Sequence, residues 1–290
     1  MIKSKYKISS FDVAVWIISG IMLLFFLFPL LFILANAFSD PIAVYSGQVT
    51  FIPKGFTIEN ILDVFREEKL MQGLFNTIWY TVVGTILQVV LQFSVAYPLS
   101  RKDFKGKTFV NIFFALPMFI SGGMIPTYLV VKFCGFLNTA WAIIIPGCLG
   151  LYNIIIIRTY LTSSIPYDLT EAAMIDGCGV LGCLFKVILP LCKPIICVML
   201  LYGIVGYWNS YFNSLIYTTK EELWPLQRVL QRMLMVNSTS SGSLGEAESL
   251  MKSESLKYAI ILVASAPLLI LYPFFQKYFE TGMMIGSIKG

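Results

Sequence analysis

Six long apolar stretches dominate this chain of 290 residues. They cover about residues 11–35, 74–99, 108–131, 139–161, 188–216 and 256–275. A helix over the first stretch would be about 37 Å long at about 1.5 Å per residue, which is enough to cross a bilayer core of about 30 Å. The pattern predicts an all-α, polytopic membrane protein with six transmembrane helices.

The first stretch has an alternative interpretation, because Ala35-Asn36-Ala37 resembles a signal-peptidase site. The apolar region of a signal peptide is about 7–15 residues long, and this stretch is much longer. We therefore expect a retained first span. A mature N-terminus near Phe38 would overturn that expectation.

The composition excludes several classes of protein. Hydrophobic residues make up 57% of the chain and charged residues 13%, against about 25% charged in soluble domains. The chain has no His, which excludes His-dependent catalytic triads and His-ligated zinc or haem. None of the six Cys residues forms a CxxC pair, so we expect buried free thiols and no metal site. The net charge of +5 is scattered at the ends of apolar stretches, which argues against nucleic-acid binding.

The basic residues predict the orientation in the membrane, because cytoplasmic loops are enriched in Lys and Arg. Residues 1–10 carry three Lys, the 101–107 loop carries four basic residues, and the C-terminal tail carries Lys277 and Lys289. Both termini and the polar segment at about 166–186 are therefore expected in the cytoplasm, with segment 219–256 outside. The expected divisions are residues 1–72 (tail, first helix and outer loop), a five-helix core at 73–280, and a tail at 281–290.

A polar segment between the fourth and fifth stretches needs an explanation in so apolar a chain. It runs Glu171-Ala172-Ala173-Met174-Ile175-Asp176-Gly177. Pro166 suits a first helical turn, and Gly177 suits a left-handed helix end. The spacing predicts a short helix with Glu171, Met174, Ile175 and Cys178 on one face and Leu169, Ala172, Ala173 and Asp176 on the other. The small Ala residues permit a close approach, and a carboxylate suits a basic partner. The alternative is an ordinary connecting loop.

The segment resembles the signature of integral membrane permeases of ATP-binding-cassette (ABC) importers. That signature is Glu-Ala-Ala, three residues, Gly, nine residues, a β-branched residue, one residue, and Leu-Pro. Here it is Glu171-Ala172-Ala173, Gly177, Val187 and Leu189-Pro190, with Val187 where Ile is common. Further similarity to the maltose-type carbohydrate permeases, oligosaccharide branch, lies in Asp40-Pro41, Gly55-Phe56-Thr57, Tyr207-Trp208-Asn209 and Trp224-Pro225-Leu226-Gln227.

The resemblance implies a type I importer permease with a MetI-like fold in the cell membrane. It implies a second permease subunit, two ATPase subunits that use ATP and Mg, and an extracellular solute-binding protein that delivers a carbohydrate. This chain itself would bind no cofactor and would not be an enzyme. The resemblance assigns ATPase coupling to the residues of the signature: Glu171, Ala172, Ala173, Asp176, Gly177, Leu189 and Pro190.

Aromatic and amide side chains in the fifth stretch could stack on and hydrogen-bond a sugar. They are Tyr207, Trp208, Asn209, Tyr211 and Asn213. For any single one of these residues we favour the alternative, an interfacial aromatic belt with interhelical amide bonds. Segment 219–256 could contact the binding protein, or its Ser/Gly-rich half at 238–245 could be a flexible loop.

Other functions remain as alternatives. An importer for a non-sugar solute, such as a peptide, would have the same signature. An ion-coupled secondary carrier would usually need charged residues at the membrane midplane, and no paired carboxylates lie within a span. A membrane enzyme would need clustered catalytic groups. Co-purification with an ATPase would separate an ABC importer from the carrier and the enzyme.

Overall fold

A computed structural model describes residues 9–120, 122–237 and 246–287. Within these ranges the regular structure is helical, without β-strands. The chain forms two compact units. Unit 1 comprises Met1–Glu68 and Arg232–Ser265, and unit 2 comprises Lys69–Gln231 and Ala266–Gly290.

Unit 1 is built around α1 (Ser10–Ala37), which Ser9 caps by accepting a hydrogen bond from the Phe11 amide. Most of α1 presents apolar side chains on every side, as expected for a helix that faces lipid. The unit also contains α2 (Pro41–Tyr45), α3 (Glu59–Arg66), the end of α14 (Leu226–Asn237) and the first part of α15 (Glu246–Ser287).

The end of α1 is fixed to α3 by hydrogen bonds. The Asn60 amide donates to the carbonyls of Ala37 and Ser39 at 3.2 and 2.8 Å. Asp63 of α3 pairs with Lys252 of α15 at 2.8 Å, and this hydrogen bond lowers the pKa of Asp63 below its usual value. Polar contacts therefore hold the loops of unit 1 together at one end of α1.

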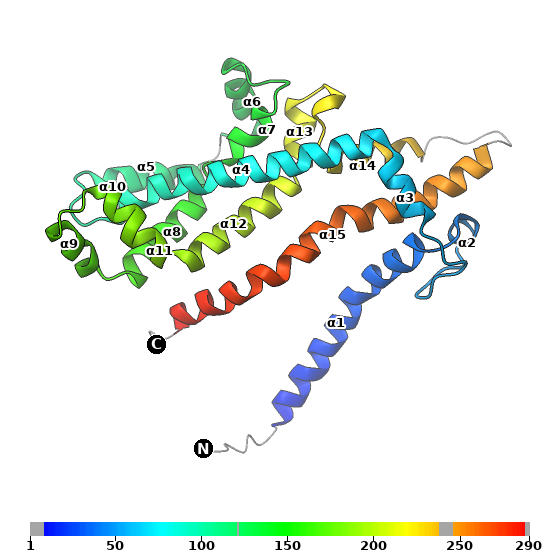
Figure 1. Cartoon of the computed structure of the whole chain (residues 1–290), viewed down its shortest axis with the longest axis horizontal. Coiled ribbons are helices and arrows are strands. Elements are labelled where there is room, and N and C mark those ends of the chain that lie inside the picture. Colours follow the sequence, from blue (N-terminus) through cyan, green and yellow to red (C-terminus); the bar gives the residue numbers. More distant parts are fainter. Residues whose placement is uncertain (1–8, 121, 238–245, 288–290) are drawn as a thin grey trace. The chain divides into compact units, whose positions relative to one another are not determined.

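The longest uninterrupted helix of unit 2 is α4 (Glu68–Ser100). Only its first residue, Glu68, belongs to unit 1. Figure 1 shows α9, α10 and α11 at one end of α4, with α13 and α14 toward the other. The remaining elements, in chain order, are α5 (Lys107–Phe119), α6 (Met124–Phe133), α7 (Trp141–Ile144), η1 (Ile145–Gly147), α8 (Leu151–Ser164), α9 (Tyr167–Ile175), α10 (Val180–Cys183), η2 (Leu184–Ile188), α11 (Leu189–Leu191), α12 (Lys193–Trp208), α13 (Tyr211–Tyr217) and η3 (Glu221–Leu223).

Three of the six predicted spans are single helices, and three are helix pairs with a break. Residues 10–37, 68–100 and 251–276 are continuous, and each is long and apolar enough to cross a membrane. The pairs are Lys107–Phe119 with Met124–Phe133, Trp141–Gly147 with Leu151–Ser164, and Val180–Leu191 with Lys193–Trp208. The second pair bends by 46° and the third by 83°. The described residues therefore contain six candidate spans when each pair counts as one.

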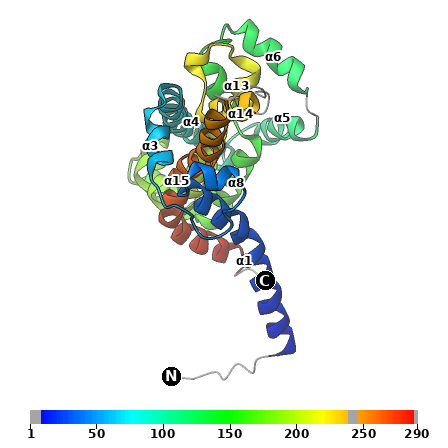
Figure 2. The same cartoon turned by 90° about the vertical axis from the view of Figure 1, so that its right-hand side faces the viewer.

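The breaks occur where Pro and Gly interrupt the apolar sequence. Pro146 lies in η1, and Gly147 and Gly150 flank the bend before α8. Pro194 lies in the first turn of α12, where its missing amide proton costs nothing. Figure 2 shows α5 and α6 as separate helices. The predicted fifth span, residues 188–216, was wrong in extent, because α12 ends at Trp208 and α13 is a separate helix.

Helices α4 and α12 pack at very short range because glycine lies at each contact. A Cβ on Gly84 would lie 2.7 Å from the Tyr207 ring, and one on Gly203 would lie 2.8 Å from Thr85 Cγ2. Small residues allow helix backbones to approach closely in membranes. The core of unit 2 therefore depends on this crossing.

Two further expectations can be compared with the structure. The six Cys form no disulfides among the described residues, and Cys148, Cys183 and Cys192 are buried as predicted. Cys178 and Cys197 are half-buried, and Cys134, in the turn that ends α6, is exposed. Segment 219–256 is not a bare loop, since it contains η3, α14 and the start of α15. Its Ser/Gly-rich stretch at 238–245 lies outside the described residues.

Candidate functional site

The polar segment of unit 2 folds as α9 (Tyr167–Ile175), with the ends that its sequence predicts. Pro166 is the N-cap residue, and Asp168 lies in the first turn, where a negative charge is favourable. Gly177 adopts a φ of +82° just after the helix. The amides of Cys178 and Gly177 donate to the carbonyls of Ala173 and Met174 at 2.9 and 3.1 Å. This Schellman arrangement satisfies carbonyls that would otherwise lack partners.

One stripe of α9 is buried, and the rest of the helix is exposed. Thr170 and Ala173 are buried, and Met174 is half-buried. The exposed residues are Asp168, Leu169, Glu171, Ala172, Ile175 and Asp176, with Ile175 86% exposed. The predicted division into faces was wrong in two places. Glu171 is exposed whereas Met174 is half-buried, and Ala172 is exposed whereas Ala173 is buried. The reason is that the buried stripe passes through residues 170, 173 and 174.

After α9 the chain returns to the core through three short helical pieces. In α10, the π-helical segment η2 and the residue after α11, the buried side chains are Cys183, Leu184, Ile188 and Cys192. They belong to the same hydrophobic cluster as Phe93, Ala96, Tyr97 and Leu99 near the end of α4. Leu189 packs against this cluster, whereas Pro190 is exposed. The predicted coupling segment is therefore exposed on α9 and anchored through α10 and η2.

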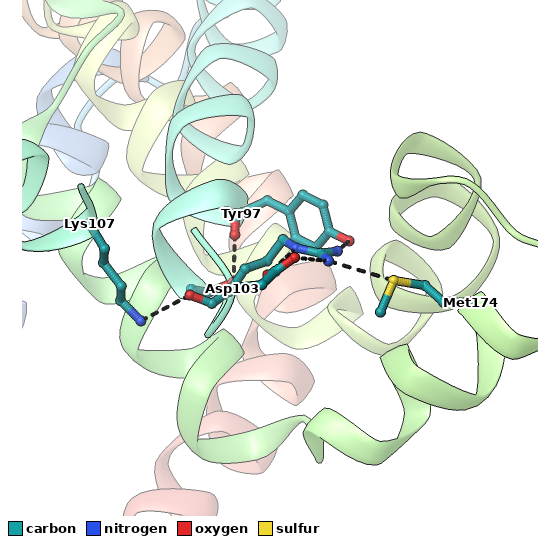
Figure 3. A network of polar contacts seen from close by, with 6 residues as sticks. Tyr97, Asp103, Lys107 and Met174 are labelled. Carbon is teal, nitrogen blue, oxygen red and sulfur yellow. Dashed lines mark hydrogen bonds and ion pairs between the residues drawn. The ribbon is translucent and has the colours of Figure 1, made fainter. Parts of the chain in front are cut away.

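A buried arginine joins the end of α4 to α9. Arg101 is only 8% exposed. Its Nε and Nη2 donate to the two carboxylate oxygens of Asp103 at 2.8 and 2.7 Å, and its Nη1 donates to the Tyr97 hydroxyl at 3.3 Å. Its Nη2 also lies 3.6 Å from the sulfur of Met174 on α9. Figure 3 shows Tyr97, Asp103 and Met174 around this guanidinium, with Lys107 donating to the Arg101 carbonyl.

The electrostatics of this network stabilise the charged forms of both partners. Hydrogen bonding to Arg101 lowers the pKa of the Asp103 carboxyl. The same pair raises the pKa of Arg101, against the opposing effect of its burial. A buried charge is costly unless it is paired and hydrogen-bonded. The bidentate contact with Asp103 meets that condition and fixes the plane of the guanidinium.

A second cation contacts the opposite end of α9. Lys102 Nζ lies 4.7 Å from the centre of the Tyr167 ring, and Tyr167 is the first residue of the helix. A cation over an aromatic ring at an exposed site contributes about 0.5–1 kcal/mol. Two successive residues after α4 therefore contact both ends of α9. In the sequence, Arg101 and Lys102 indicate only orientation, and nothing near them indicates these contacts, since Met174 lies 73 residues from Arg101.

The residues predicted to line a substrate path do not converge on one polar cavity. Tyr207 is buried and donates to the Ile144 carbonyl at 2.9 Å. Trp208 lines a cavity of about 360 Å³ with mostly apolar side chains of α4, α12 and α15 and with Thr81 and Thr85 of α4, so the cavity offers a sugar few polar partners. Asn209 is exposed, and its amide donates to the Val205 carbonyl within its own helix. Tyr211 and Asn213 are half-buried on α13.

The family of the chain follows from comparison with known proteins. Residues 88–285, more than half of the chain, match the family described as the binding-protein-dependent transport system inner membrane component. This match includes α9 and the Arg101 network. The chain belongs to this family. The permease is a multi-pass membrane protein with a transport role.

Curated relatives align over nearly the whole permease. Protein LplC of Bacillus subtilis is 37% identical over 90% of this chain and 89% of its own length. The polygalacturonan/rhamnogalacturonan transport system permease YtcP of the same organism is 36% identical, over 94% and 97% respectively. The arabinooligosaccharides transport system permease AraQ of Halalkalibacterium halodurans is 30% identical over 91% of each chain.

A solved structure has the same fold. It comes from a bacterial ABC transporter involved in the import of the acidic polysaccharide alginate. It matches with a TM-score of 0.86 and 29% identity, covering 96% of this chain and 100% of that chain. The predicted type I importer permease fold, MetI-like, is therefore confirmed.

Proposed function

We propose that this permease forms, with a second permease subunit, the membrane path of an ATP-driven importer for an oligosaccharide. Two separate ATPase subunits supply the energy, and an extracellular solute-binding protein delivers the substrate. The observation that carries this proposal is the coupling segment: α9 has an exposed carboxylate at Glu171 and is anchored to the helix core through α10 and η2. The relatives named for polygalacturonan/rhamnogalacturonan transport and for arabinooligosaccharides transport support the substrate class.

Helix α9 is the element on which an ATPase subunit would act. Its exposed surface combines the carboxylates of Glu171 and Asp176 with the apolar side chain of Ile175, a mixture suited to a groove with a basic group. ATP-driven closure of the two ATPase subunits moves α9 as a rigid body. Because η2 is packed in the core with the end of α4, the spans follow. This is a two-state change biased by nucleotide.

The charge distribution supports an orientation with both termini in the cytoplasm. The loop 101–107 and α9 then lie on the same side as the N-terminal Lys residues, where the ATPase subunits have access to nucleotide. Segment 219–237 then lies outside, where it can meet the binding protein. The charge bias of the loops is the support for these assignments.

A charge reversal on α9 tests the proposal. Glu171→Lys should leave membrane insertion intact but abolish uptake and the ATPase activity of the assembled complex, because it places a cation opposite the basic group expected on the ATPase. The matched control is Glu67→Lys, a charge reversal at an exposed residue of unit 1. Normal uptake by Glu171→Lys would refute the coupling role.

The substrate class has its own test. Binding of oligogalacturonides, arabino-oligosaccharides and short peptides to the associated solute-binding protein can be measured by calorimetry. Binding of a carbohydrate supports the proposal. If only peptides bind, the proposed importer function stands, but its proposed substrate changes from a carbohydrate to a peptide.

A further inference from the structure

Helix α4 is held at both ends by contacts with other segments of unit 2. It is continuous from Glu68 to Ser100, which corresponds to about 50 Å at about 1.5 Å per residue. At the α9 end, the contacts are those of Arg101 and Lys102. The opposite end contacts residues 221–226, the segment that contains η3.

The contacts at this second end are numerous and directed at backbone atoms. The Asn76 amide donates to the carbonyls of Glu222 and Trp224 at 2.7 and 3.1 Å. The Tyr80 hydroxyl donates to the Leu223 carbonyl at 2.8 Å. Side chains of α4 therefore hold this segment by its main chain.

Three more contacts complete this attachment. The Leu226 amide donates to the Thr77 hydroxyl at 2.8 Å, and Lys69 pairs with Glu221 at 3.2 Å. A Cβ on Gly73 would lie 3.2 Å from the Leu226 Cα, so the two backbones are in close contact. Segment 221–226 is thus fixed to the first four turns of α4.

The α9 end of α4 is reinforced where the helix would otherwise be weakest. Pro98 lies in the last turn and cannot donate the usual helical hydrogen bond. Arg101 bridges this point, because its amide donates to the Pro98 carbonyl at 3.2 Å and its Nη1 donates to the Tyr97 hydroxyl. The guanidinium then reaches Met174. The connection from α9 to α4 therefore does not depend on the turn at Pro98 alone.

We propose that α4 is a rigid strut that transmits movement of α9 to segment 221–226 at its opposite end, with Arg101 as the positioning residue that holds α9 to the strut. This inference rests on the proposed coupling role of α9. It predicts that the state of the ATPase subunits is sensed at segment 221–226 through α4. By reciprocity, a ligand that binds at segment 221–226 changes the nucleotide state.

The test uses the whole complex in proteoliposomes, with the solute-binding protein and its substrate. The readouts are assembly, basal ATP hydrolysis, stimulation of hydrolysis by the loaded binding protein, and substrate transported per ATP. Arg101→Gln removes the charge and the bidentate contact, and Asn76→Ala removes two of the hydrogen bonds at the other end. Lys105→Gln is the matched control, since Lys105 is an exposed basic residue of the same loop as Arg101.

Each single variant should assemble and keep basal hydrolysis, while stimulation and transport per ATP fall by about fivefold or more, as expected for a lost coupling of this kind. The double variant should be no worse than the more severe single variant, because both interrupt one strut. Arg101→Lys keeps the positive charge but loses the bidentate guanidinium contact, so its stimulation and transport per ATP should lie between those of the native protein and Arg101→Gln. This variant also serves as a second test should Arg101→Gln fail to fold.

Two results would overturn the inference. In the first, the Arg101 variants show the same stimulation and transport per ATP as Lys105→Gln. In the second, the losses caused by Arg101→Gln and Asn76→Ala multiply in the double variant, which would make the two sites independent. Failure of the proposed function can be told apart from failure of this inference, because normal uptake by Glu171→Lys would refute the coupling role of α9 itself. If Glu171→Lys abolishes uptake while the Arg101 and Asn76 variants are normal, α9 couples by another route.

Discussion

The close crossing of α4 and α12 makes a quantitative prediction about two glycines on the same helix. Gly203 faces Thr85, and an added Cβ would lie 2.8 Å from Thr85 Cγ2 and 2.9 Å from its Oγ1. Gly206, three residues later, has no atom within 4 Å of its Cβ position. Substitution of each by Ala therefore changes helix propensity equally but packing very differently.

The magnitudes follow from these two contributions. Replacing Gly by Ala within a helix stabilises by about 1 kcal/mol. Overpacking costs about 1–3 kcal/mol, and Thr85 has little freedom to move because it is β-branched. Gly206→Ala should therefore stabilise by about 1 kcal/mol, whereas Gly203→Ala should lose about 0–2 kcal/mol. The variants should differ by about 1–3 kcal/mol.

Thermal unfolding of the detergent-solubilised complex measures this difference. At about 2–4 °C per kcal/mol, the two Tm values should be about 2–12 °C apart, with Gly203→Ala lower. Adding Thr85→Ala should recover part of the loss, since the Thr85 Cβ still lies 3.1 Å from the new methyl group. Equal Tm values for the two Ala variants, or no recovery in the double variant, would refute the packing argument.

Three further predictions concern single residues. Gly177→Ala should lower Tm more than Gly177→Asn, because φ is +82° and this conformation costs a residue with a Cβ about 1–2 kcal/mol, less for Asn. Tyr207→Phe should cost about 1 kcal/mol through the lost hydrogen bond to Ile144, and uptake assays should show an unchanged KM; a large KM change would place Tyr207 in the substrate path instead. A membrane-impermeant maleimide should label exposed Cys134 in intact protoplasts but label Cys178 only after permeabilisation, and the reverse pattern would invert the proposed orientation.

Local features of the sequence were sufficient to predict much of unit 2. The limits of α9 follow from Pro166 and Gly177, because one residue starts a helix favourably and the other ends it in a left-handed conformation. The continuous spans follow from the length of their apolar stretches. These are properties of neighbouring residues, and they do not depend on the packing of distant segments.

The features that the sequence did not reveal depend on contacts between distant residues. Ala172 and Ala173 are identical in type, yet one is exposed and the other buried, because the core decides which stripe of α9 faces inward. Arg101 follows an apolar helix, and at that position a basic residue normally marks orientation. Its contact with Met174 arises only when the end of α4 and α9 pack against the same cluster.

The stability of α9 bears on how force can pass through it. A helix of nine residues is marginal on its own, so its shape must come from its surroundings. The Schellman end, the buried Thr170 and Ala173, and the two cations at its ends supply this support within the chain. An ATPase subunit that grips such a helix loses no free energy in folding it first. Displacement of α9 can then reach α4 directly, whereas a flexible loop would absorb the same displacement by changing its own conformation.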